Sequence, residues 1–358
     1  MSKSWYSKGI IMSLLALLSI NSVFASSVSI GDSKIVLGAN IDMLAVSRNY
    51  GDKGEQQELL LREVEVSLES QINPWLYGFV FMTRPDEEGF TVEEAAVIAD
   101  LPWNFRLKAG NYRNEFGLLN VIHEPERPQI SIPLPIEEFL GEEQLREASV
   151  TIGNAFNIGD GKRAGISIAL LNSDNEVAFN DKQSGDKAFA GKLYYGHRIN
   201  SFSYKLGLSA LSGKNDADGS LTTNLQVVDF SIFIDSDYNK GVDYSARFSL
   251  MGEVLFNQRE LESGKTNSAN GFWAIADYQF IPSHHLGLGM EYSQNILDNS
   301  IKSKAYSAHY SWYYSSHARV QLMGRRLELD DAELGFEFML QWNIVLFPHT
   351  EKSFLDLF

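Results

Sequence analysis

Apolar and polar residues alternate along most of the chain after residue 34, the period expected of strands with two different faces. In the last long segment, apolar side chains hold the even positions from Phe336 to Leu346, and Glu337, Gln341 and Asn343 hold odd positions. The same period recurs at 35–42, 63–69, 201–210, 242–256, 286–293 and 306–314. A soluble sandwich rarely loads its solvent face so evenly, whereas a transmembrane barrel needs apolar-out and polar-in on every strand. We therefore expect an all-β, transmembrane antiparallel β-barrel.

Turn residues and prolines divide this alternation into about sixteen strands. Short turns are predicted near residues 73, 102, 159, 199, 238, 283 and 316, with longer connections between them. Fourteen strands is the alternative, because three of the early segments alternate weakly. An even number of strands with short turns on one side is the bacterial arrangement. Four tryptophans fall near predicted strand ends, as an aromatic belt would place them: Trp75, Trp103, Trp312 and Trp342.

The first 25 residues have the pattern of a cleaved signal peptide. They combine Lys3 and Lys8 with an apolar run and a small-residue site that ends at Ala25. The apolar run is about half of the roughly 20 residues that span a bilayer, which disfavours an uncleaved anchor. Export followed by strand insertion predicts the outer membrane of a Gram-negative cell.

The rest of the chain divides into a barrel over 26–347 and a short C-terminal extension over 348–358. The strand 336–347 is the expected recognition element for the barrel-assembly machinery. Outer-membrane lipid and lipopolysaccharide are the expected surroundings, and whether the barrel is a monomer or a homotrimer is left open.

Composition excludes several other functions. A formal net charge of −16 disfavours nucleic acid as a partner. The absence of cysteine excludes disulfides and thiol-based sites. No nucleophile motif such as G-x-S-x-G is present, so we expect neither an enzyme nor a cofactor.

Residues 113–147 form the longest irregular stretch, with four prolines and no alternation. Loops of this length are usually functional or disordered. We expect this loop to fold into the lumen as a constriction; the alternative is an acidic loop on the cell surface. The predicted constriction residues are Glu137, Glu138, Glu142, Glu143 and Arg146 of the loop region, with Arg106 and Lys108 on the preceding strand.

Charged residues of both signs fall on the predicted lumen face. Because uncompensated burial of charge is costly, we expect them to line a water-filled pore. The predicted pore-lining residues are Glu63, Glu65, Glu69, Arg247, Glu291, Arg319, Arg325 and Glu337.

Two groups of histidines are candidate metal ligands. His123 precedes Glu124 and Glu126, and His284 and His285 fall in a predicted turn. Neither group has a tetrahedral ligand set at a recognised spacing, so no metal site is expected.

Three segments carry a family resemblance: LREVEVSLESQINPW, LPWNFRLKAGNYRNEFGLLN and FLGEEQLREASV, within residues 58–150. The chain resembles a family of outer-membrane proteins related to the phosphate-selective porins O and P, whose members are often labelled zinc-regulated or TonB-dependent receptors. The resemblance implies a porin-like barrel with both termini in the periplasm. Alternation begins by Lys34, so we expect no plug domain of the TonB-dependent type.

These observations predict a channel for passive diffusion of small hydrophilic solutes or ions, with a mild cation preference from the glutamates. The alternative is a non-conducting outer-membrane barrel that works as an adhesin or receptor.

Overall fold

The computed structural model describes residues 26–30, 33–50, 55–84, 89–179, 186–234, 246–315, 317–330 and 334–347. The predicted signal peptide (1–25) and C-terminal extension (348–358) lie outside these residues, and both stay predictions. The strands are β1 (Ser26–Ile30), β2 (Ser33–Tyr50), β3 (Glu55–Asn73), β4 (Leu76–Arg84), β5 (Thr91–Asp100), β6 (Phe105–Arg113), β7 (Arg146–Gly159), β8 (Lys162–Leu171), β9 (Ala188–Ile199), β10 (Phe202–Lys214), β11 (Thr222–Ile234), β12 (Phe248–Glu260), β13 (Thr266–Ile281), β14 (His284–Gln294), β15 (Lys302–Ser315), β16 (Ala318–Leu329) and β17 (Gly335–Phe347). The helical elements are η2 (Pro102–Asn104), η3 (Glu124–Glu126), α2 (Leu134–Leu140) and α3 (Glu176–Phe179). Within the described ranges, no helix is long and apolar enough to cross a membrane.

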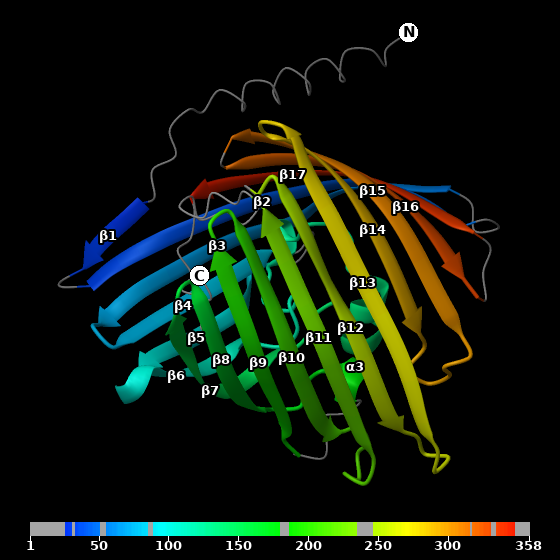
Figure 1. The fold of residues 1–358 in the computed structure, drawn as a ribbon, viewed down its shortest axis with the longest axis horizontal. Coiled ribbons are helices and arrows are strands. Elements are labelled where there is room, and N and C mark those ends of the chain that lie inside the picture. Colours follow the sequence, from blue (N-terminus) through cyan, green and yellow to red (C-terminus); the bar gives the residue numbers. More distant parts are fainter. Residues whose placement is uncertain are drawn as a thin grey trace.

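Sixteen strands of the described chain, β2 to β17, form a closed antiparallel barrel in which each strand pairs with the next. The barrel closes where β17 pairs with β2, with Leu340 opposite Ala45. Figure 1 shows this closure as red β17 beside blue β2. The short β1 pairs with the start of β2, where Ser26 lies opposite Leu37. The predicted all-β barrel and the count of sixteen are confirmed.

The strands turn their apolar side chains outward and their polar side chains inward. In β17, Phe338 is 62% exposed and Gln341 is 1% exposed. In β14, Leu288 is 68% exposed and Glu291 is 3% exposed. So many exposed large apolar residues match a hydrocarbon environment rather than water. The register predicted from the sequence is confirmed on both strands.

One end of the barrel carries the short turns. The turns predicted near 73, 102, 159, 199 and 283 are present, and β15 and β16 pair Ser315 with Ala318 across the one predicted near 316. The turn predicted near 238 falls outside the described residues. Between β7 and β8, Asp160 and Gly161 have φ of 50° and 73°, the left-handed pair that a tight hairpin requires. A Cβ on Gly161 would lie 2.4 Å from the Arg198 carbonyl oxygen, so only glycine fits there.

An aromatic belt surrounds the short-turn end of the barrel. Trp75 and Trp103 lie in the turns after β3 and β5, and Trp312 lies near the end of β15. The three are 55%, 87% and 38% exposed, respectively. The His284 ring stacks on Trp312 with centroids 6.1 Å apart. Amphipathic rings at this level are typical of a membrane interface.

Candidate functional site: the barrel lumen and its inward loop

The connection between β6 and β7, residues 114–145, folds into the barrel. Its backbone hydrogen-bonds to side chains on the inner wall. The N–H of Leu119 donates to Glu253 at 2.8 Å, and the N–H of Leu134 donates to Glu291 at 2.8 Å. On β16, Arg319 donates to the Pro125 carbonyl at 2.8 Å. We refer to residues 114–145 as the inward loop.

Apolar packing holds both ends of the inward loop. Phe116, Leu119, Phe139, Leu140 and Leu145 are all at most 2% exposed. Their partners are apolar residues that point inward from β8 to β13, among them Leu171, Leu211, Leu225, Val227, Met251, Leu255, Trp273 and Ile275. Removing this apolar surface from water stabilises the inward position of the loop, at about 25 cal/mol per Å². If every inward position is assumed to be polar, these inward apolar residues are overlooked, although the sequence shows them.

The loop also contains a short helix, which the sequence analysis did not predict because of the four prolines. Helix α2 begins after Pro133 with Pro135 in its first turn, where a missing N–H costs nothing. It ends at Gly141, whose φ of 74° few other residues adopt. The helix packs against β13, β14 and α3, and α3 lies inside the barrel in Figure 1.

Seven of the eight predicted pore-lining residues are buried on the inner wall: Glu63, Glu65, Glu69, Glu291, Arg319, Arg325 and Glu337. The eighth, Arg247, is exposed, because it precedes β12 rather than lying within it. Within the described residues, the strand predicted over 242–256 begins at Phe248, and the placement of Arg247 in the pore lining stays a prediction.

Many inner-wall charges are compensated by protein groups. Arg325 pairs with Glu291 at 2.6 Å and with Glu337 at 3.2 Å. Arg319 binds loop carbonyls and the Gln341 side chain. Ion pairs and loop backbone thus supply partners for these residues, and the water-filled pore lining stays a prediction.

The predicted constriction residues lie in several environments. Glu137 and Glu142 are exposed, Glu143 pairs with Arg146, and Arg146 also lies 3.5 Å from Glu93. Glu138 accepts hydrogen bonds from the Asn295 side chain at 2.9 Å and the Ile296 N–H at 3.0 Å. Glu138 thus ties α2 to the connection after β14.

The two basic residues predicted on β6 have other partners. Arg106 pairs with Asp100 at 2.9 Å near the short turns. Lys108 is buried, and its Nζ lies 4.2 Å from the centroid of the Tyr112 ring. In the described part of the chain, neither basic residue forms an ion pair with Glu137 or Glu138. Both glutamates belong to α2, which packs against β13 and β14.

Ionisation in the inward loop departs from ordinary values. Although Glu137 is exposed toward the lumen, partial desolvation by the surrounding protein raises the pKa of its carboxyl, and the nearby Arg325 opposes this shift. Burial also raises the pKa of Glu138. Burial lowers the pKa of the Arg127 guanidinium to about 10, although Glu124 favours its charged form. Arg127 therefore stays protonated at neutral pH, and the two glutamates take up protons more readily than ordinary ones.

The two adjacent histidines point to opposite sides of the wall. Both lie on β14 rather than in a turn: His284 faces the aromatic belt, and His285 faces inward. His285 Nδ1 lies 2.6 Å from Asp277, and His309 Nε2 lies 3.0 Å from the same carboxylate. His284 and His285 therefore cannot bind the same metal ion.

A cluster around His123 was missed by sequence reasoning, which paired this histidine with Glu124 and Glu126. Glu124 instead lies beside Arg62 at 3.3 Å and Arg127 at 3.6 Å. His123 lies against wall glutamates of β3 and β5. The available signal was the pair of consecutive glutamates at 93–94, which interrupts the alternation of β5.

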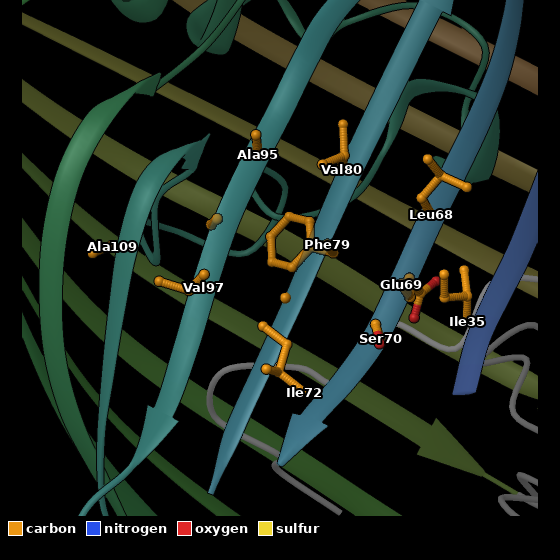
Figure 2. Close-up of a pocket in the computed structure, with 12 residues that line it drawn as sticks. Ile35, Leu68, Glu69, Ser70, Ile72, Phe79, Val80, Ala95, Val97 and Ala109 are labelled. Atoms are coloured by element: carbon orange, nitrogen blue, oxygen red, sulfur yellow. The ribbon is translucent and has the colours of Figure 1, made fainter. Parts of the chain in front are cut away.

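A shallow apolar hollow lies on the outer wall over β2 to β6. Ile35, Leu68, Ile72, Val80 and Val97 contribute to its lining (Figure 2). It belongs to the lipid-facing surface, since Leu68, Ile72 and Val97 are among the exposed apolar residues. A solute path through the lumen therefore does not include it.

Comparison with known sequences gives one distant relative. An uncharacterized protein of Aquifex aeolicus (strain VF5) is 27% identical over 346 residues, which cover 85% of this chain and 72% of that protein. A comparison with protein-family models finds no match.

Solved structures similar to this chain are barrels of outer-membrane proteins. The outer membrane channel DcaP of Acinetobacter baumannii matches with a TM-score of 0.62 and 10% identity over 90% of this chain and 100% of that chain. An anion-selective porin from Comamonas acidovorans gives 0.61 and 11% over 88% and 100%. The trimer form of OmpT from Vibrio cholerae gives 0.59 and 8% over 87% and 99%. At these identities the likeness establishes a porin-like barrel fold.

Proposed function

We propose that this protein is an outer-membrane channel for passive diffusion of small hydrophilic solutes or ions, narrowed by its inward loop. The observation that carries the proposal is the closed sixteen-strand barrel formed by the described residues, with a lipid-compatible outer face and a loop anchored inside. A barrel of this size is too wide for side chains alone to fill, and an inserted loop sets the remaining width.

The proposed selectivity is a mild preference for cations. Glu137 and Glu142 are exposed on the inward loop, and Glu143 is exposed at its end. Rings or patches of carboxylate near a narrow passage favour cations over anions. The same charges are screened by salt over about 10 Å at 0.1 M, so the preference weakens at high ionic strength.

The second candidate is a barrel that does not conduct. The apolar cluster of Phe116, Phe139 and Trp273 favours it, because these buried loop and wall side chains pack together on that side of the lumen. Such a barrel would present its loops as a binding surface. Neither candidate function depends on the predicted relation to the phosphate-selective porins O and P. Neither depends on regulation by phosphate or zinc availability.

Liposome swelling separates the two. Vesicles that contain the purified protein are diluted into isotonic arabinose, glucose, sucrose or raffinose. A narrow channel admits the smaller sugars and excludes the larger ones. No swelling with any sugar, combined with no ion current, would reject the channel and leave the closed barrel.

The same proposal includes assembly in the membrane. Outer-membrane lipid and lipopolysaccharide fit the exposed apolar wall, and insertion through the barrel-assembly machinery follows from the terminal strand β17. The hollow over β2 to β6 (Figure 2) is a candidate contact between copies in a homotrimer. The mass of the detergent-solubilised protein, corrected for bound detergent, distinguishes a trimer from a monomer.

A further inference from the structure

His123 of the inward loop brings a ring nitrogen to two buried glutamates of the wall. Its Nδ1 lies 3.1 Å from Glu65 Oε2, and its Nε2 lies 3.5 Å from Glu94 Oε1. One ligand atom each from Glu65, Glu93 and His123 lies within 4.8 Å of the other two, and all three residues are buried. One imidazole nitrogen with two carboxylate oxygens is a donor set suited to zinc and similar transition metals. Mg²⁺ and Ca²⁺ prefer oxygen ligands alone.

A β-bulge places the two glutamates of β5 at this site. Phe81 of β4 lies opposite Glu94, but the next residue, Met82, lies opposite Val92. Glu93 is therefore the extra residue of the bulge, and both Glu93 and Glu94 are buried inside the barrel. Bulges commonly re-aim side chains next to functional sites. A regular strand would have sent one of these two carboxylates into lipid.

Two carboxylate oxygens of the site lack hydrogen-bond donors. Glu65 Oε2 and Glu94 Oε1 accept no hydrogen bond from any described residue, although Glu65 is 3% and Glu94 1% exposed.

Positive charge reaches only part of this site. Arg113 compensates Glu93 at 2.7 Å and Glu94 at 3.4 Å. Across the described ranges Glu65 forms no ion pair with a lysine or arginine, and its charged neighbour is His123. Buried carboxylates without a cation are costly, so this side of the cluster calls for positive charge.

The histidine ring is already oriented for ligation. Its face packs on Phe81, with centroids 4.9 Å apart. Nδ1 faces Glu65, and Nε2 faces Glu94. A ligating histidine usually donates its second N–H to a carboxylate, and Glu94 stands where that partner is needed.

We propose that Glu65, Glu93 and Nδ1 of His123 bind a divalent transition-metal cation of the zinc class, with Glu94 orienting the ring. The bound cation ties the inward loop to β3 and β5 and so fixes the loop against the wall. The site does not depend on whether the barrel conducts.

Zinc binding to the full-length protein in detergent tests the site. Protein is treated with a chelator, dialysed, and titrated with ZnCl₂ in competition with a chromophoric chelator. We expect one zinc per chain, no displacement by excess Mg²⁺ or Ca²⁺, and slower proteolysis within the inward loop when zinc is bound. His123→Gln and Glu65→Gln should each weaken binding at least about tenfold, since even the loss of a residue that only orients a ligand costs 10–100-fold.

His309→Gln is the matched control, because it removes a buried inner-wall histidine that pairs with Asp277. It should leave zinc affinity unchanged. The heat-dependent shift in electrophoretic mobility shows that each variant has folded; if His123→Gln fails to fold, Glu65→Gln decides. Absence of stoichiometric binding in the wild type overturns the proposal. Binding that survives both site variants, or that only His309→Gln removes, overturns it as well.

Discussion

The carboxylate of Glu253 accepts a hydrogen bond from the backbone N–H of Leu119 at 2.8 Å, although the two residues are 134 positions apart. The same carboxylate accepts hydrogen bonds from the N–H of Leu118 and from Trp273 Nε1 at 3.1 Å. Glu253 is 1% exposed. One side chain of the wall thus fixes the turn at which the inward loop enters the lumen.

Removing this anchor should loosen the loop. Glu253→Ala deletes the acceptor for three donors, and hydrogen bonds to charged groups contribute about 1.5–3 kcal/mol each. We expect faster proteolysis within residues 114–145 and a lower denaturant midpoint for loop release, while the barrel stays intact. Glu262→Gln, in the exposed connection after β12, is the control and should change neither. Equal protection of the loop in both variants would show that apolar packing alone holds it.

The lipid face of β17 can be tested with one charge. Leu340→Arg should destabilise the barrel by about 2–4 kcal/mol, because position 340 faces the hydrocarbon. Ser300→Arg adds the same charge to an exposed connection and should leave the stability of the barrel unchanged. Unfolding in urea from lipid vesicles gives both values. Equal stability of the two variants would place Leu340 away from lipid.

Assembly should depend on β17 and not on the residues that follow it. A chain truncated after Phe347 keeps every strand pair between β17 and β2. We therefore expect it to reach the outer membrane in normal amounts. A second truncation, after Gln341, removes the pairs from Trp342 to Phe347 and should abolish insertion. Loss of insertion in the first truncation would instead assign recognition to the last eleven residues.

Cation preference should weaken at mildly acid pH. Burial raises the pKa of Glu137 and Glu138, so both accept protons at a higher pH than an ordinary glutamate with a pKa of about 4.3. The folded state binds these protons more tightly than the unfolded state, so the stability contributed by these groups increases as pH falls through that window.

Measured in a KCl gradient, the zero-current potential should move toward anion preference between pH 7 and about pH 5. The double variant Glu137→Gln, Glu138→Gln should already show the shifted potential at pH 7 and lose this pH dependence. An unchanged pH dependence in the double variant would assign it to other groups.

Alternation predicted the barrel because each strand separates lipid from lumen. Apolar side chains therefore face lipid and polar side chains face the lumen at every second residue. Phe338 and Glu337 illustrate it. The contacts inside the lumen could not be predicted in this way, because they join distant parts of the chain. Glu291 and Leu134, for example, are 157 positions apart. The cluster at His123 was hidden for a different reason. A bulge at Glu93 breaks the period of two on which the prediction depended.

Single-channel recording in a planar bilayer tests the central claim, a conducting barrel narrowed by its inward loop. Wild-type protein should give small, uniform conductance steps in 1 M KCl. Deletion of residues 116–143 should increase the step size severalfold, and Glu253→Ala should give larger or noisier steps than Glu262→Gln. A wild-type protein that inserts without conductance steps, together with a loop deletion that also stays silent, would contradict the claim.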